Sequence, residues 1–162
     1  MGGSHEFLKN GVRNLDARTL FHFTAICVTP AMVQKMIGAG SQYMAAYVDA
    51  NGDYIDGGQT YKLHLPPNIP INNFWSVTLY DPGTRSLLQT DQSKPSINSF
   101  DESEKNEDGS YDIYFSPSAP AGKEKNWIQT DPGKGWFTYI RLYSPLGPFF
   151  DQTWRPDDIV KV

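Results

Sequence analysis

The sequence predicts a mainly β domain: an antiparallel jelly-roll-like β-sandwich with a short N-terminal helical segment. Three observations lead to this class. Aromatic residues make up 14% of the chain, and large aromatic side chains suit the faces of β-sheets. The chain has 14 glycines and 12 prolines, which make turns frequent and long helices unfavourable. Residues 74–81 and 136–143 are rich in aromatic and β-branched residues and alternate in part, as half-buried strands do.

A length of 162 residues fits one domain of ordinary size. Residues 1–14 begin with a Gly/Ser-rich stretch that is typical of a tag or linker, and we expect them to be linker-like or disordered. We expect residues 15–42 to form a helical segment that packs on the sheet. Residues 43–162 are then the jelly-roll-like β domain.

The helical segment is expected to contain two short helices. Asp16 is a suitable N-cap for a helix over residues 15–23. This helix should end or bend before Pro30, because a proline disfavours the helical conformation of the residue before it. Pro30 also suits the first turn of a second helix over residues 31–37, which the glycines after it can close.

From residue 43 onward the pattern changes to short strands separated by turn residues. Asn51-Gly52 predicts a tight turn, and Asp56-Gly57-Gly58 predicts a bulge or a second turn. Pro82-Gly83 turns the chain from the strand at 74–81 into residues 85–89. Residues 91–110 are polar and acidic, which predicts a solvated loop, with a cation-binding lid as the alternative. The expected strands are 43–49, 61–65, 74–81, 112–115, 136–143 and 159–162.

Charge and composition restrict the partners. The formal net charge of −4 argues against a nucleic-acid backbone or an anionic membrane surface as the main partner. No apolar run approaches the roughly 20 residues needed to span a bilayer. The single cysteine, Cys27, cannot form an intrachain disulfide, and in its apolar surroundings we expect a buried, unreactive thiol.

No segment carries a recognisable catalytic motif, so the sequence does not decide whether the domain is an enzyme. Asp49-x-Asn51-x-Asp53 resembles the start of a calcium loop, but Tyr54 and Thr60 occupy the positions where such a loop needs Gly and Glu. The expected structure there is a hairpin turn. His22 and His64 do not form a metal site by their spacing. We therefore predict no metal and no cofactor, and a structural role for His64.

Arg141 is the most informative charge, because it lies among aromatic residues in a strand that we expect to be central. A buried guanidinium must be paired, and Asp81, at the end of the strand 74–81, is the expected partner. Anchoring of a ligand by Arg141 is the alternative. Trp127 either fills the core or provides a stacking platform at a cleft. The candidate ligand-binding residues are Trp127, Asn126, Arg141, Asp81, Tyr80 and His64.

Two functional hypotheses follow. The aromatic content without a catalytic motif favours a binding or assembly module for a carbohydrate-like ligand, a partner domain or a second copy of the chain. The alternative is a hydrolase that acts on a glycan or an ester with polar residues at the strand ends. Jelly rolls host both kinds of function. The hydrolase requires a shared pocket for its polar residues, which are Ser76, Tyr80, Asp81, His64, Arg141 and Asn126.

An ordered set of short motifs resembles domain-of-unknown-function family 1214. The motifs are Tyr47-x-Asp49, Asp56-Gly57-Gly58-x-x-Tyr61-x-Leu63-x-Leu65-Pro66, Phe74-Trp75-Ser76 with Tyr80-Asp81, Asp108-Gly109-Ser110, Pro120-x-Gly122, Asn126-Trp127 and Arg141-Leu142-Tyr143-Ser144-Pro145. The resemblance runs from Leu15 to the C-terminus. It implies a jelly-roll-like β domain that, in longer bacterial proteins, follows a partner domain of family 1254.

The resemblance also implies an exported or periplasmic location, although no signal peptide is recognisable in this sequence. A partner domain of family 1254 is not recognisable either, and we expect the chain to be a fragment of a longer protein or a short member. The family brings no established catalytic residue, so none is transferred to this chain.

Overall fold

The structure of the protein, a computed structural model, describes residues 8–19 and 35–162. The chain divides into two compact units, residues 1–36 and 37–162. In the first unit, β1 (Leu8–Lys9) and β2 (Val12–Arg13) pair antiparallel. This hairpin lies within the segment that the sequence predicts to be linker-like.

Residues 15–19 are helical, in agreement with the start of the first predicted helix. The side chain of Asn14 caps this helix, because its Oδ1 accepts a hydrogen bond from the backbone N–H of Ala17 at 3.2 Å. The predicted cap, Asp16, is therefore wrong by two residues. The rest of that helix, with His22 and Cys27, lies outside the described residues, as does most of the second predicted helix. Residues 35–37, its described end, are not helical.

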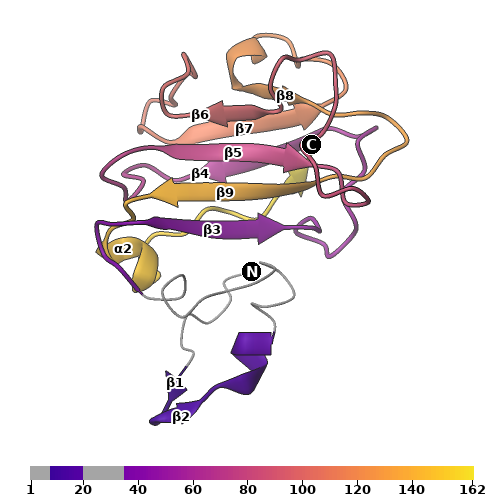
Figure 1. The fold of residues 1–162 in the computed structure, drawn as a ribbon. Coiled ribbons are helices and arrows are strands. Elements are labelled where there is room, and N and C mark those ends of the chain that lie inside the picture. Colours follow the sequence, from indigo (N-terminus) through magenta and orange to yellow (C-terminus); the bar gives the residue numbers. More distant parts are fainter. Residues whose placement is uncertain (1–7, 20–34) are drawn as a thin grey trace. The chain divides into compact units, whose positions relative to one another are not determined.

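The second unit is built from two four-stranded sheets (Figure 1). The first, called sheet I here, has the order β3-β9-β5-β6, and the second, sheet II, has the order β10-β4-β7-β8. The strands of sheet I are β3 (Ser41–Ala46), β9 (Phe137–Tyr143), β5 (Trp75–Tyr80) and β6 (Ser96–Asn98). The strands of sheet II are β10 (Val160–Lys161), β4 (Tyr61–Leu65), β7 (Tyr111–Ser116) and β8 (Trp127–Gln129). A 3₁₀ turn, η2 (Glu124–Asn126), precedes β8, and a short helix, α2 (Gly147–Phe150), follows β9.

The predicted class is confirmed: the protein is mainly β, with a jelly-roll-like sandwich of two sheets. The pairing departs from the prediction at one place, because β7 and β8 run parallel. Residues 117–126 connect the end of β7 to the start of β8 and return the chain toward the end of the sheet where β7 begins, which allows the two strands to run parallel. Residues 85–89 form only one bridge, between Tyr80 and Leu87.

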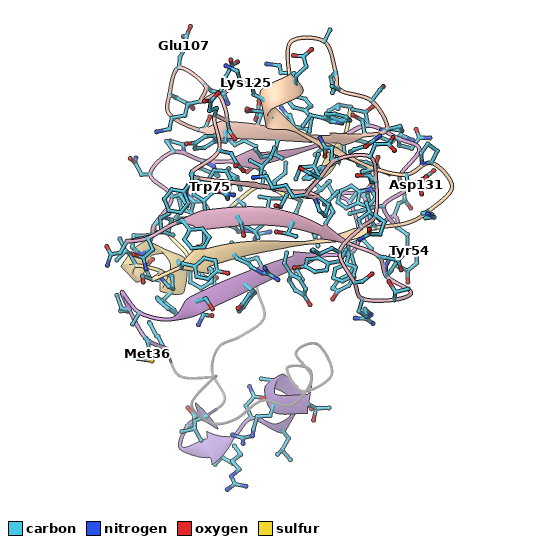
Figure 2. All side chains as sticks on the ribbon, turned by 45° about the horizontal axis from the view of Figure 1, so that its top comes forward. Met36, Tyr54, Trp75, Glu107, Lys125 and Asp131 are labelled. Atoms are coloured by element: carbon cyan, nitrogen blue, oxygen red, sulfur yellow. The ribbon has the colours of Figure 1, made fainter. Side chains whose placement is uncertain are left out.

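Alternation of side chains places one face of each sheet in a common core. On β4 the residues Tyr61, Leu63 and Leu65 are buried, whereas Lys62 and His64 between them are half-buried. On sheet I the core side is formed by Trp75 (labelled in Figure 2) and by every second residue after it along β5. The buried apolar residues of both sheets form one hydrophobic cluster. The core therefore lies between the sheets, and the opposite face of each sheet points away from it.

The predicted turn at Asn51-Gly52 is confirmed. The carboxylate of Asp49 accepts hydrogen bonds from the backbone N–H groups of Asn51 and Asp53, at 2.9 and 3.1 Å. Gly52 has a φ of 87°, a conformation that favours glycine. The side chain of Asp49 thus stabilises a hairpin turn.

Gly57 is required where two loops meet. A Cβ at this position would lie 2.3 Å from the backbone oxygen of Asp131 and 2.7 Å from that of Lys134. We expect Gly57→Ala to lower the free energy of unfolding by about 1–3 kcal/mol, as overpacked sites do. Gly58→Ala is the matched control, since its nearest contact is 3.4 Å away. Urea unfolding measures the free energy of unfolding of both variants. Equal losses for Gly57→Ala and Gly58→Ala would contradict the prediction, because they would mean that the two loops move apart to admit the added Cβ.

Among residues 8–19 and 35–162, no helix has the length and apolar character needed to cross a bilayer.

Candidate functional site

The outward face of sheet I carries aromatic side chains on three neighbouring strands. The strand register places Tyr43 of β3 beside Arg141 of β9, and Arg141 beside Ser76 of β5. Residues two positions apart on a strand share a face, so the aromatic residues of these strands gather around Arg141. We call this surface the aromatic face. Its residues are Tyr43, Tyr47, Phe74, Ser76, Thr78, Tyr80, Phe100, Phe137, Tyr139, Arg141 and Tyr143.

The rings of the aromatic face stack on one another. Phe137 is stacked with Tyr47 at a centroid distance of 4.8 Å and with Tyr80 at 5.3 Å. At the other end of the face, Tyr143 is stacked with Phe74 at 4.0 Å. The rings of Phe137, Tyr47, Tyr80, Phe74 and Tyr143 therefore each have at least one ring face against another ring of the same surface.

The face has a buried centre and an exposed rim. Phe137 is 2% exposed and Tyr80 is 9% exposed, although both lie on the side of the sheet that points away from the core. Tyr43 and Phe100, by contrast, are 52% and 77% exposed. Sheet I thus has a second apolar layer outside the core, with large aromatic side chains open to solvent at its edge.

Arg141 is half-buried among these rings. Its guanidinium carbon lies 5.6 Å from the ring centroid of Tyr43 and 5.7 Å from that of Tyr80. One Nη atom donates a hydrogen bond to the hydroxyl of Tyr80. The Nε atom is buried and has no hydrogen-bond partner among the described residues. Within this part of the chain, Arg141 also has no ion pair.

The hydroxyl groups of Tyr139 and Tyr80 stay protonated well above neutral pH. Burial, together with the neighbouring Tyr47, whose hydroxyl lies 3.4 Å away, raises the pKa of Tyr139 to about 12. Burial also raises the pKa of Tyr80, although the charge of Arg141 acts in the opposite direction. These hydroxyls can therefore donate hydrogen bonds at neutral pH.

A raised folded-state pKa has a consequence for stability at high pH. The contribution of Tyr139 is fully present below its unfolded-state pKa of about 10, and it is lost as the pH rises toward about 12. We expect alkaline unfolding to be less steep in Tyr139→Phe than in the wild type. Ultraviolet titration of tyrosinate should also lose one late-titrating group in this variant. An unchanged titration curve would contradict this assignment.

The predicted pairing of Arg141 with Asp81 is wrong. Arg141 faces Ser76 in the register, five residues before Asp81, and Asp81 lies beyond the end of β5. The carboxylate of Asp81 instead accepts hydrogen bonds from the backbone N–H groups of Gly83 and Thr84, at 2.7 and 2.8 Å. These bonds lower its pKa, with that from Thr84 as the largest cause. Asp81 thus shapes a turn.

Asn126 and Trp127 lie on the side of sheet II. Asn126 is buried, and its amide is fully engaged: Oδ1 accepts from the N–H of Glu104, and Nδ2 donates to the carbonyls of Glu104 and Asp112. Trp127 is half-buried on β8, where its indole N–H donates to the carbonyl of Ser116 at 2.9 Å. Trp127 neither belongs to the buried core nor shares a face with Arg141.

His64 lies on the outward face of sheet II. Its Nδ1 is 2.7 Å from the carboxylate of Asp112, which also lies 3.7 Å from the amine of Lys62. A shallow depression of about 270 Å³ adjoins these residues and is lined by Lys62, His64, Asp157, Asp158 and Val160. Residues 8–19 and 35–162 contain no group of three His, Cys, Asp or Glu side chains that could hold a metal ion.

Of the six candidate residues, only Tyr80 and Arg141 lie on the aromatic face. His64 and Asn126 both contact Asp112 on sheet II, through its carboxylate and its backbone carbonyl respectively. The sequence reasoning missed Tyr43, Tyr47 and Tyr139 as members of the same surface. A signal for them was present, because aromatic residues recur every second position in 137–143, with Arg141 in the series, and Tyr43 and Tyr47 are four apart.

The fold has solved relatives. A crystal structure of the VPA0106 protein from Vibrio parahaemolyticus matches with a TM-score of 0.70 and 21% identity, over 99% of this chain and 38% of that one. A putative uncharacterised protein from Burkholderia cenocepacia matches with a TM-score of 0.50 and 20% identity, over 78% of this chain and 31% of that one. At these identities the likeness shows the fold, and this chain spans well under half the length of either protein.

No curated protein matches this sequence. A family model, described as "Protein of unknown function (DUF1214)", matches residues 40–147. This range holds β3 to β9 and all the residues of the aromatic face. The chain therefore belongs to the DUF1214 family.

Proposed function

We propose that this domain is an assembly module that uses the aromatic face to hold a protein partner. The observation that supports the proposal is the aromatic layer on the outward side of sheet I, with Arg141 at its centre. Tyrosine, tryptophan and arginine are the residue types that carry most binding energy in protein interfaces. A buried centre with an exposed aromatic rim also matches the anatomy of such interfaces.

A protein surface fits this face better than a carbohydrate does. A sugar ring stacks on an open aromatic ring, whereas Phe137 is stacked with Tyr47 and Tyr80. The open rings, Tyr43 and Phe100, lie on and beside the two edge strands of sheet I, β3 and β6. A surface of ring edges and hydroxyl groups suits the side chains of a second folded domain.

The proposal takes the partner to be a domain of the kind that precedes this fold in longer proteins, such as the family 1254 domain that the sequence resemblance implies. The length of the Vibrio protein supports this, since the likeness to this chain accounts for 38% of it. The hydrolase alternative gains no support from the geometry. Its polar residues are divided between a turn and the two sheets.

The proposal is tested by panning a phage-displayed library of random short peptides on the immobilised protein. We expect enriched peptides that combine apolar and acidic residues. Their affinity should fall about tenfold or more with Tyr43→Ser, because this ring is 52% exposed on the aromatic face. Tyr54→Ser is the matched control, since Tyr54 (labelled in Figure 2) is 87% exposed and is not one of the residues of the aromatic face.

Circular dichroism and thermal unfolding establish that both variants are folded. Lack of enrichment over bare support would contradict the proposal, as would equal binding to both variants. Calorimetry with cello- and chito-oligosaccharides forms a second arm. If the protein binds a saccharide and Tyr43→Ser abolishes this binding, the ligand of the aromatic face is a glycan and the proposal of a protein partner is wrong.

A further inference from the structure

The aromatic face is locally cationic in an acidic protein. The chain has a formal net charge of −4, yet none of the strand residues that point outward from sheet I is acidic. Arg141 lies at the centre of this face, and the guanidinium of Arg85 lies 5.9 Å above the ring centroid of Phe137. An acidic group on a partner would therefore meet attraction here.

Arg141 is incompletely satisfied within the described residues. It makes one hydrogen bond, to the hydroxyl of Tyr80, and its buried Nε has no partner. A guanidinium that is partly removed from water without an opposite charge raises the free energy of the folded state. The nearby rings of Tyr43 and Tyr80 offset part of this cost through cation–π contacts. They also restrict the position of the guanidinium.

We infer that Arg141 is a binding site for a carboxylate group, which a protein partner inserts between the tyrosines of the aromatic face. That the carboxylate belongs to a protein partner depends on the proposed function above. The carboxylate site itself is inferred from the geometry of Arg141 alone. A planar guanidinium binds a carboxylate through two parallel hydrogen bonds.

Carboxylate fits this site better than phosphate. The described strands place one guanidinium at the centre of the face, and their backbone N–H groups are used in the sheet ladder. A phosphate carries more charge and more acceptor oxygens, and it needs several donors. The tyrosine hydroxyls around Arg141 are neutral donors that suit a singly charged, planar group.

The test is a titration of the whole chain with N-acetyl-aspartate N-methylamide, which carries a single carboxylate, at low ionic strength, followed through the Nε–H signals of arginine in proton–nitrogen correlation spectra. We expect a saturable shift of the Arg141 signal and no saturable shift with N-acetyl-asparagine N-methylamide, which has nearly the same shape and no charge. Binding should weaken about tenfold or more in Arg141→Met, and less in Arg141→Lys. Arg85→Met is the control for general loss of positive charge, and it should change the affinity by less than about threefold.

Three results would overturn the inference. The first is an unchanged Arg141 signal, the second is an equal effect of N-acetyl-asparagine N-methylamide, and the third is tighter binding of inorganic phosphate at matched ionic strength. These results are independent of the peptide panning. If peptides bind the aromatic face but Arg141 shows no response to the carboxylate, the assembly module is supported and the carboxylate site at Arg141 is contradicted. If Arg141 responds to the carboxylate but no peptide is enriched, the carboxylate site is supported and the assembly module is contradicted.

Discussion

Replacing Phe137 with alanine is expected to lower the free energy of unfolding by about 3–5 kcal/mol, which is the usual cost of deleting a buried aromatic side chain. Phe137 is 2% exposed even though it lies on the outward side of sheet I. Its ring is stacked with Tyr47 and Tyr80 and meets Tyr139 edge-on at 5.5 Å. The substitution would therefore open a cavity in the aromatic layer. Urea unfolding followed by circular dichroism measures the loss.

The control for this effect is Tyr54→Ala, which removes an aromatic ring that is 87% exposed. We expect its stability to change by no more than about 0.5 kcal/mol, as is usual for exposed surface positions. A loss of less than about 1 kcal/mol for Phe137→Ala would mean that the rings of the aromatic face are loosely arranged. The interpretation of this face as a packed layer would then fail.

Replacing Asn126 with alanine is expected to cost about 3 kcal/mol or more, because the loss of a buried hydrogen-bond partner costs about 1–3 kcal/mol for each group left unsatisfied. The amide of Asn126 connects the backbone of Glu104 to that of Asp112 on β7, at distances of 2.7 to 3.0 Å. The same change should speed hydrogen exchange at the Glu104 amide.

Asn73→Ala is the comparison for Asn126. Its side chain also makes a hydrogen bond, to the hydroxyl of Ser144 at 2.9 Å, but it is exposed to solvent. Water can replace the lost partner, so we expect a loss below about 1 kcal/mol. Equal losses in the two variants would contradict a structural role for Asn126 as the connection between the acidic loop and β7.

The strands with strong alternation were predictable from the sequence. Residues 61–65 form β4 as expected, because Tyr61, Leu63 and Leu65 alternate with polar residues and one side of the strand is buried. Strands β6 and β8 were missed. Each has three residues, which is too short for a pattern of period two, and β8 pairs parallel with β7 through a long connection. Nothing in the local sequence specifies such a pairing.

The surroundings of Arg141 could not be predicted without the register. Asp81 was a chemically reasonable partner, but a strand separates neighbours by about 3.3 Å per residue, so five residues place it far from Ser76. The recurring aromatic residues of 137–143 did not identify an outward face for a different reason. Large apolar or aromatic residues lie on both sides of β9, with Phe137, Tyr139 and Tyr143 on one side and Ile140 and Leu142 on the other, so alternation does not reveal which side forms the core.

The most direct test of the assembly module is hydrogen–deuterium exchange of the whole chain, alone and saturated with the tightest peptide from the phage selection. The account predicts that exchange slows in β3, β5 and β9, around Tyr43, Tyr80 and Arg141, and is unchanged in β4 and β10. Slower exchange confined to β4 and β10, beside His64, would contradict it and would place the binding surface on sheet II.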